Sequence, residues 1–304
     1  MATSRDRSES VAHSPASSIA IAWVVVLLVS SLGDILWFEL TGAVPVGLFR
    51  FKLILLGGLI LLSWLWNPIR ALRPFFVMLL AIMSLMWVKT WLLDSSAWMA
   101  WQNGQSFTAV TLTAQLVEAG VALLLIGLLF LLRKRRQRFF LVIGDMNAKA
   151  EPIRWLAQKS PGPLWSFGLI FTLVVIVGQF FMFILPLSPA SDTLRQLMPL
   201  IPVILLLAAS NGVTEEIIYR AAPISPVYEV VGKANALWMA AILFGLSHYI
   251  GGSPAGILGF LITALLGWFF GKCMLDSQGF FYPWLFHTLQ DILPFTLMAL
   301  VAIP

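Results

Sequence analysis

Long apolar runs separated by short polar segments make up almost the whole chain. A transmembrane helix needs about 20 apolar residues, and runs of roughly this length predict spans at 19–40, 44–66, 74–93, 110–132, 165–187, 199–219, 234–250, 255–274 and 281–303. Transmembrane β-strands would instead alternate apolar and polar residues over segments of about ten residues. The continuous runs therefore predict an all-α fold, a polytopic transmembrane helical bundle of about eight or nine spans.

Polar segments divide the chain into four parts. We interpret residues 1–18 as a disordered polar tail and 19–132 as N-terminal transmembrane helices. Residues 133–163 form a basic cytoplasmic loop in this interpretation, and 164–304 form a C-terminal transmembrane domain. No small-residue cleavage site closes the first apolar run, which we therefore expect to act as a signal anchor.

The composition excludes an ordinary soluble domain. Hydrophobic residues make up 60% of the 304 positions and charged residues 11%, whereas soluble domains carry about 25% charged residues. The formal net charge of +5 reflects basic loops, because 133–163 is rich in Lys and Arg while 94–108 contains neither. Basic loops mark the cytoplasmic side of a membrane. We therefore expect an integral multi-pass membrane protein with a cytoplasmic N-terminus, contact with anionic lipids of the bilayer, and no nucleic-acid partner.

Charged side chains inside the apolar runs are the next informative feature, since each is costly at membrane depth. In the N-terminal half, four of them lie close enough to predicted span ends to reach the membrane surface: Asp34, Arg50, Lys52 and Lys89. Glu118 is deeper and lies near Gln115. Two interpretations stay open for Glu118, a functional carboxyl group or a structural hydrogen bond to another helix.

The C-terminal half carries a denser polar set. Glu215 and Glu216 are adjacent near the predicted end of an apolar helix, and Arg220 follows Glu216 by four residues. Residues four apart share a helix face, so we expect Glu216 to pair with Arg220 while Glu215 points elsewhere and stays free to titrate. Two further spans contribute His248 and His287, and His287 precedes Asp291 by four residues.

Three kinds of chemistry are compatible with this set. In the first, Glu215 and His248 activate a water molecule, and His287 with Asp291 binds the oxyanion formed during amide hydrolysis. In the second, Glu and His bind a divalent metal, although the HExxH pattern is absent. In the third, the set is a proton relay or substrate site of a transporter, although no inverted repeat is visible. A nucleophilic Ser247 is disfavoured, because adjacent residues of a helix point in different directions.

Three motifs stand in order along the C-terminal spans: Glu215-Glu216-Ile217-Ile218-Tyr219-Arg220, then Phe244-Gly245-Leu246-Ser247-His248, then His287-Thr288-Leu289-Gln290-Asp291. They resemble the EExxxR, FxxxH and HxxxN/D motifs of the CPBP family of intramembrane glutamic proteases, also called CAAX prenyl proteases or bacteriocin-processing Abi proteins. The resemblance covers roughly residues 200–295, and the N-terminal half shows none.

The resemblance implies a CPBP-like catalytic domain at 164–304 that cuts a membrane-anchored or lipidated protein or peptide without a metal or other cofactor. It implies that Glu215 and His248 activate water, that His287 and Asp291 form the oxyanion side, and that Glu216, Arg220 and Phe244 support the site. The third motif ends in Asp where the prenyl-protein proteases have Asn. An ionised Asp cannot donate a hydrogen bond, so Asp291 either orients His287 or is protonated.

The composition resembles a bacterial member, which implies a location in the bacterial cell membrane. The alternatives to an intramembrane peptidase are a membrane scaffold or immunity protein without proteolytic activity, and a transporter that uses the same polar set.

Overall fold

The computed structural model describes residues 16–133, 135–153, 160–252 and 254–303. Helix α1 begins at Ala16, so the last three residues of the predicted tail are helical, and residues 1–15 lie outside the described part. Lys134 and residues 154–159 of the basic loop also lie outside it. Helices dominate the described residues, and the two strands β1 (Lys149–Ala150) and β2 (Gly162–Pro163) pair antiparallel within the basic loop.

Within the described residues, eight helical segments are long and apolar enough to cross a membrane, which confirms the predicted all-α bundle. Five of them are α3 (Val46–Leu65), α5 (Arg73–Leu93), α7 (Phe107–Arg133), α13 (Lys233–Gly251) and α14 (Gly256–Ser277). The others are α15 (Phe281–Ala302) and two composite segments, Leu164–Leu187 and Ser191–Ile224. A bent pair, α1 (Ala16–Val29) and α2 (Leu32–Thr41), meets at 41° and makes a ninth span if counted as one. The short helices α4 (Asn67–Arg70), α6 (Ser96–Gln102) and α12 (Tyr228–Val231) lie in connections.

The two composite segments contain wide turns. Leu164–Leu187 consists of α8 (Leu164–Gln179), the π-helix η3 (Phe180–Ile184) and η4 (Leu185–Leu187). Ser191–Ile224 consists of α9 (Ser191–Leu197), η5 (Met198–Leu200), α10 (Ile201–Glu216), the π-helix η6 (Ile217–Ala221) and α11 (Ala222–Ile224). The predicted end of this span at residue 219 is therefore wrong, because the helix continues through a π turn to Ile224. Glu215 and Glu216 consequently lie inside the span rather than at its end.

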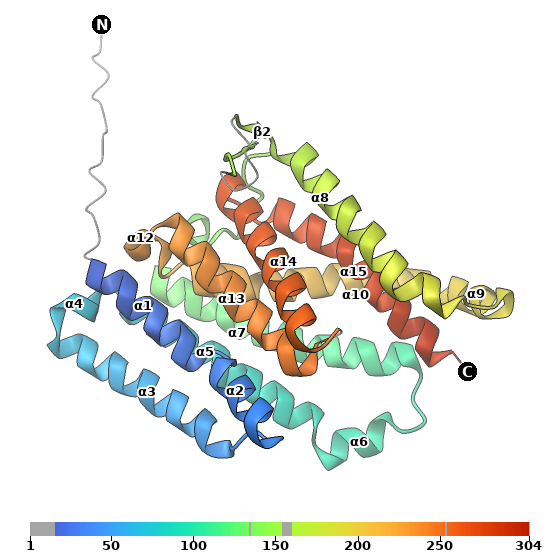
Figure 1. Cartoon of the computed structure of the whole chain (residues 1–304), viewed down its shortest axis with the longest axis horizontal. Coiled ribbons are helices and arrows are strands. Elements are labelled where there is room, and N and C mark those ends of the chain that lie inside the picture. The colour runs from blue at the N-terminus through green and yellow to red at the C-terminus, as the bar shows by residue number, and fades with distance from the viewer. Residues whose placement is uncertain (1–15, 134, 154–159, 253, 304) are drawn as a thin grey trace, which may run out of the picture.

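Helix α15 packs along α10, while α13 and α14 pack against each other and against η6. Figure 1 shows α13 beside α14, α15 near α10, and α8 across one side, while α1, α3 and α5 form the opposite flank. Glycines permit the tightest approaches. A Cβ on Gly212 of α10 would lie 2.9 Å from Thr288 Oγ1 of α15, and a Cβ on Gly245 of α13 would lie 2.7 Å from Ala264 Cβ of α14. Small residues at such crossings bring membrane helices together, here α10 with α15 and α13 with α14.

The basic loop is a docked structural element. The Tyr282 hydroxyl donates to the Met146 carbonyl oxygen at 2.6 Å, and the Phe280 N–H donates to the Val142 carbonyl oxygen at 2.7 Å. Gly144 has a φ of 87° and lies against the backbone of Gly279. These contacts attach the loop to the turn between α14 and α15, a feature that its charge alone did not predict.

The basic connections gather at one end of the bundle. Ser18 of α1 donates to the Pro68 carbonyl oxygen of α4 at 3.2 Å, and Arg133 at the end of α7 pairs with Glu229 of α12 at 2.7 Å. Lys233 at the start of α13 pairs with Glu151 of the loop, also at 2.7 Å. The predicted grouping of basic loops on one side agrees with this arrangement, and the cytoplasmic placement of that side stays a prediction.

Candidate active site

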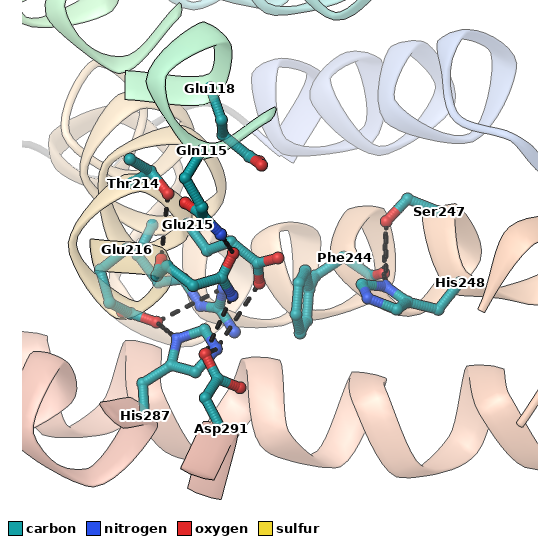
Figure 2. A network of polar contacts seen from close by, with 12 residues as sticks. Gln115, Glu118, Thr214, Glu215, Glu216, Phe244, Ser247, His248, His287 and Asp291 are labelled. Carbon is teal, nitrogen blue, oxygen red and sulfur yellow. Dashed lines mark hydrogen bonds and ion pairs between the residues drawn. The ribbon is translucent and has the colours of Figure 1, made fainter. Parts of the chain in front are cut away.

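The imidazole of His287 lies among three carboxylates (Figure 2). Its Nδ1 is 2.7 Å from Glu216 Oε1, and its Nε2 is 3.5 Å from both Glu215 Oε2 and Asp291 Oδ2. A carboxylate oxygen only accepts hydrogen bonds, so Nδ1 carries the proton. The ring of Phe270 stacks on the imidazole, with centroids 4.4 Å apart. His287 lies near Asp291, as predicted. The shortest polar contact of His287 is with Glu216, and this contact was not predicted.

Glu216 and Arg220 form the expected ion pair, with Glu216 Oε1 3.5 Å from Arg220 Nη1 and both side chains fully buried. The guanidinium carbon lies 4.0 Å from the ring centroid of Phe244 and 5.2 Å from that of Phe270. Among the described residues, the nitrogens of Arg220 have no hydrogen-bond partner. Charge and cation–π contacts therefore hold this guanidinium behind the site.

His248 lies on the other side of Phe244 (Figure 2), and the two rings are 4.5 Å apart. Its Nδ1 is 2.9 Å from the Phe244 carbonyl oxygen and 3.2 Å from Ser247 Oγ. Because a carbonyl oxygen only accepts, Nδ1 carries the proton and Nε2 has the free lone pair. No hydrogen bond or ion pair between His248 and Glu215 is present among the described residues.

The contact between Ser247 and His248 differs from the expectation that adjacent side chains diverge. The Ser247 hydroxyl donates to the Phe244 carbonyl oxygen at 2.7 Å, the same acceptor that His248 Nδ1 uses. A nitrogen that donates its proton to a carbonyl group cannot accept one from a serine. The geometry therefore gives Ser247 no base at Nδ1, even though the two side chains touch.

One cavity of about 480 Å³ brings the four predicted catalytic residues together. Glu215, His248, His287 and Asp291 all line it, as does Phe244. The remaining wall is largely apolar and comes from α8, η3, α14 and α15, including Val175, Met182, Phe183, Ile262, Leu265, Leu266 and Pro294. Carboxylates and imidazoles that converge on an apolar, water-accessible space are the components of a hydrolytic site.

Two amide side chains of the cavity were missed by the sequence analysis. Asn211 lies one turn before Glu215 on α10 and donates from Nδ2 to Asp291 Oδ2 at 2.9 Å. Gln290 is 2% exposed, and neither end of its amide has a partner among the described residues. The four-residue spacing of Asn211 and Glu215 was an available signal, whereas nothing in the sequence indicated the burial of Gln290.

The N-terminal charges pair with one another. Lys52 of α3 is buried and binds both Asp34 and the Ser30 carbonyl oxygen, and Lys89 Nζ of α5 lies 3.0 Å from Glu118 Oε1 of α7. Lys52 and Lys89 thus each bind a carboxylate from another helix, a contact that was not predicted. The contact of Glu118 supports its structural interpretation.

No group of three or more His, Cys, Asp or Glu residues in the described part of the chain is arranged to hold a metal ion. Cys273 is buried and forms no disulfide.

Comparison with known families agrees with the three motifs. Residues 197–293 match the family described as Rce1-like, type II CAAX prenyl endopeptidase. This match shows that the C-terminal segment is similar to the CAAX protease family. Neither a curated protein nor a solved structure gives a significant match to the chain.

The CAAX protease match spans α10, α13, α14 and the first half of α15, and it includes all three motifs. The matched family is described as one of endopeptidases, and the long apolar helices of this chain make it a multi-pass membrane protein. The helices before residue 197 lie outside the matched segment, although α8 contributes to the cavity wall.

Proposed function

We propose that the chain is an intramembrane endopeptidase of the glutamic type, which hydrolyses a peptide bond of a membrane-anchored or lipidated protein or peptide. One observation carries the proposal: Glu215, His248, His287 and Asp291, which come from three helices of the segment that matches the family, line a single cavity.

The attacking water is held between Glu215 and His248 Nε2. Its oxygen attacks the carbonyl carbon of the scissile bond while its proton passes to the Glu215 carboxylate. His248 Nε2 accepts a hydrogen bond from the second O–H of the water. This bond orients a lone pair of the water oxygen toward the carbonyl carbon. When the tetrahedral intermediate breaks down, the C–N bond cleaves and the departing amine takes the proton from Glu215.

The buried residues behind the cavity position His287. Glu216 accepts the Nδ1 proton of His287, which fixes the ring and directs Nε2 toward Glu215 and Asp291. The surrounding carboxylates offset the positive charge of the doubly protonated ring, in which Nε2 donates to the developing oxyanion. Arg220 balances part of the negative charge on Glu216.

The test uses the purified protein in liposomes with fluorescence-quenched peptides. One peptide ends in an S-farnesyl cysteine followed by three residues, one carries an N-terminal acyl chain, and one has no lipid. We expect cleavage of an anchored peptide by the wild type and strong loss in Glu215→Gln and His248→Ala. Asp192→Asn, on the exposed face of α9, is the control carboxylate. Unchanged cleavage in either site variant contradicts the mechanism, and failure of the wild type on every peptide contradicts the peptidase.

Removal of metal provides a second test of the same mechanism. We propose that no metal takes part, so EDTA is expected to leave the cleavage rate unchanged when lipid and detergent are held constant. Complete loss of cleavage with EDTA and recovery with one equivalent of zinc would replace the glutamic mechanism by a metal-dependent one.

The gathering of basic connections at one end of the bundle supports a cytoplasmic N-terminus. Single cysteines introduced at Lys149 and at Asn103, in Cys273→Ala protein, test this orientation. A membrane-impermeant thiol reagent added to intact cells is expected to label the cysteine at 103 and not the one at 149. The opposite labelling would place the basic end outside.

A further inference from the structure

A chain of hydrogen bonds connects α7 with the catalytic cavity. Gln115 Nε2 of α7 donates to Asn211 Oδ1 of α10 at 3.0 Å. Asn211 Nδ2 in turn donates to Asp291 Oδ2 of α15 at 2.9 Å. Asn211 and Asp291 both line the cavity, whereas Gln115 lies behind them.

The direction of these bonds is fixed by the carboxylate. An ionised Asp291 has no proton to give, so the amide group of Asn211 must present its NH₂ to Asp291 and its oxygen to Gln115. Gln115 must then present its own NH₂, and its Oε1 is accordingly the end that has no partner among the described residues. Gln115 thus prevents the rotation that would exchange the oxygen and nitrogen of the Asn211 amide.

One N–H of Asn211 remains for the cavity. The amide nitrogen carries two hydrogens, Asp291 accepts one of them, and the described part of the chain supplies no hydrogen-bond acceptor for the other. A donor that lines a cavity, with its orientation fixed before any substrate binds, is suited to stabilise an oxyanion.

The position on α10 fits the same role. Asn211 and Glu215 are four residues apart, so they lie on one face of α10 with Cβ atoms about 5–6 Å apart. A carbonyl group placed between them has its carbon within reach of a water held by Glu215 and its oxygen directed to Asn211. Base and donor would then be aligned by a single helix.

We propose that Asn211 is a catalytic residue that donates its second N–H to the carbonyl oxygen of the scissile bond. Asp291 is the acceptor that holds the amide, and Gln115 is a positioning residue. This inference rests on the proposed peptidase function. The neutral hydrogen-bond donor is then Asn211 of α10. The third motif of this chain ends in Asp291 and supplies a carboxylate instead.

The decisive experiment exchanges the two groups. Asn211→Asp removes the donor and places two carboxylates together, Asp291→Asn removes the acceptor, and the double variant restores one amide and one carboxylate in the opposite order. Asn103→Asp, at the exposed end of α6, is the matched control. The assay measures kcat and KM on the farnesylated peptide in liposomes.

We expect Asn211→Asp to lower kcat by about 10²–10³-fold with a much smaller change in KM, and the double variant to recover at least about tenfold of that loss. Gln115→Leu is expected to lower kcat less than Asn211→Asp does. A kcat of Asn211→Asp equal to that of the control overturns the inference, and so does a double variant no more active than Asn211→Asp.

A binding measurement separates this inference from the peptidase proposal. The probe is a farnesylated peptide aldehyde, whose hydrate has the tetrahedral geometry of the intermediate, and its affinity is measured against that of the uncleaved peptide. Asn211→Asp is expected to weaken aldehyde binding selectively. Failure of the wild type to cleave any peptide contradicts the peptidase. Equal aldehyde affinities of wild type and Asn211→Asp, or no aldehyde binding by the wild type, overturn the role of Asn211.

Discussion

The charges of the N-terminal helices and those around the cavity are balanced in different ways. In the N-terminal helices two lysines each bind one carboxylate: Lys52 binds Asp34, and Lys89 binds Glu118. Around the cavity three carboxylates share one imidazole and one guanidinium, whereas Lys272 and Asp276 of α14 form a separate one-to-one pair. An ion pair of one lysine and one carboxylate has no net charge, so it needs no further charged partner. An excess of acceptors around one imidazole leaves oxygens available to water and substrate, as the proposed hydrolysis requires.

The sharpest test of this difference compares two Glu→Gln variants. Glu215→Gln is expected to lower cleavage by about 10²–10⁴-fold, because the amide cannot take the proton of the attacking water. Glu118→Gln is expected to retain most of the activity. Initial cleavage rates on the farnesylated peptide, at matched protein per liposome, provide the comparison. Equal losses in the two variants would show that the two groups of charges do not differ in role.

Loss of Arg220 is expected to be the largest effect on stability. Arg220→Met leaves Glu216 in a fully buried position with only His287 as partner, and breaking a buried ion pair destabilises by about 3–5 kcal/mol. Unfolding in mixed micelles of increasing SDS content measures the change. The double variant Glu216→Gln/Arg220→Met should be more stable than Arg220→Met alone, and a double variant of lower stability would contradict this account.

A smaller loss is expected in the N-terminal helices. Lys89→Met removes the partner of Glu118, which is largely but not completely buried, and an unpaired polar group at such a site costs about 1–3 kcal/mol. The same unfolding assay applies. Lys89→Met/Glu118→Leu should recover most of the loss and keep normal cleavage. A double variant that is stable but inactive would give the N-terminal pair a catalytic role.

The smallest effect concerns an ion pair at the basic end of the bundle. The Lys233 side chain donates to Glu151 at 2.7 Å and holds the pKa of that carboxyl group below its usual value. The folded state therefore binds the proton less readily than the unfolded state, so the pair stabilises at pH values above the ordinary Glu pKa of about 4.3. This stabilisation is lost as the pH falls through the lowered pKa.

Both side chains of this pair are exposed, so its contribution is expected to stay under about 1 kcal/mol. The difference in unfolding temperature between wild type and Glu151→Gln should be small near neutral pH and vanish in acid. A difference that grows on acidification would contradict the assignment.

The spans were predictable because bilayer thickness imposes a length that apolar runs reveal directly. The motif residues were predictable as a group, since charged residues at membrane depth are rare and each needs a partner. The contact partners of the individual motif residues were harder to predict. Glu216 was expected to bind Arg220, but helix periodicity could not show that α15 crosses α10 close enough for His287 to reach the same carboxylate.

Two further features depended on packing between helices. The π turn after Glu216 has no residue pattern that distinguishes it from an α-helix, so the predicted span ended five residues early. The sequence shows that Lys52 and Lys89 lie close to predicted span ends, and it therefore predicts that they can reach the membrane surface. The opposing carboxylates of Asp34 and Glu118 become neighbours only when the helices assemble.

The attachment of the basic loop to the turn after α14 has a consequence for biosynthesis. Met146 leaves the ribosome long before Tyr282, its partner 136 residues later, so the loop has no surface to dock on until the last helices have been made. Insertion of the early helices can be completed while the cavity is still open. Docking of the loop against α15, the helix that carries His287 and Asp291, is therefore among the last events of maturation. A chain interrupted before α15 would lack both the docking surface and part of the cavity wall, so an incomplete product would have no assembled cavity in the membrane.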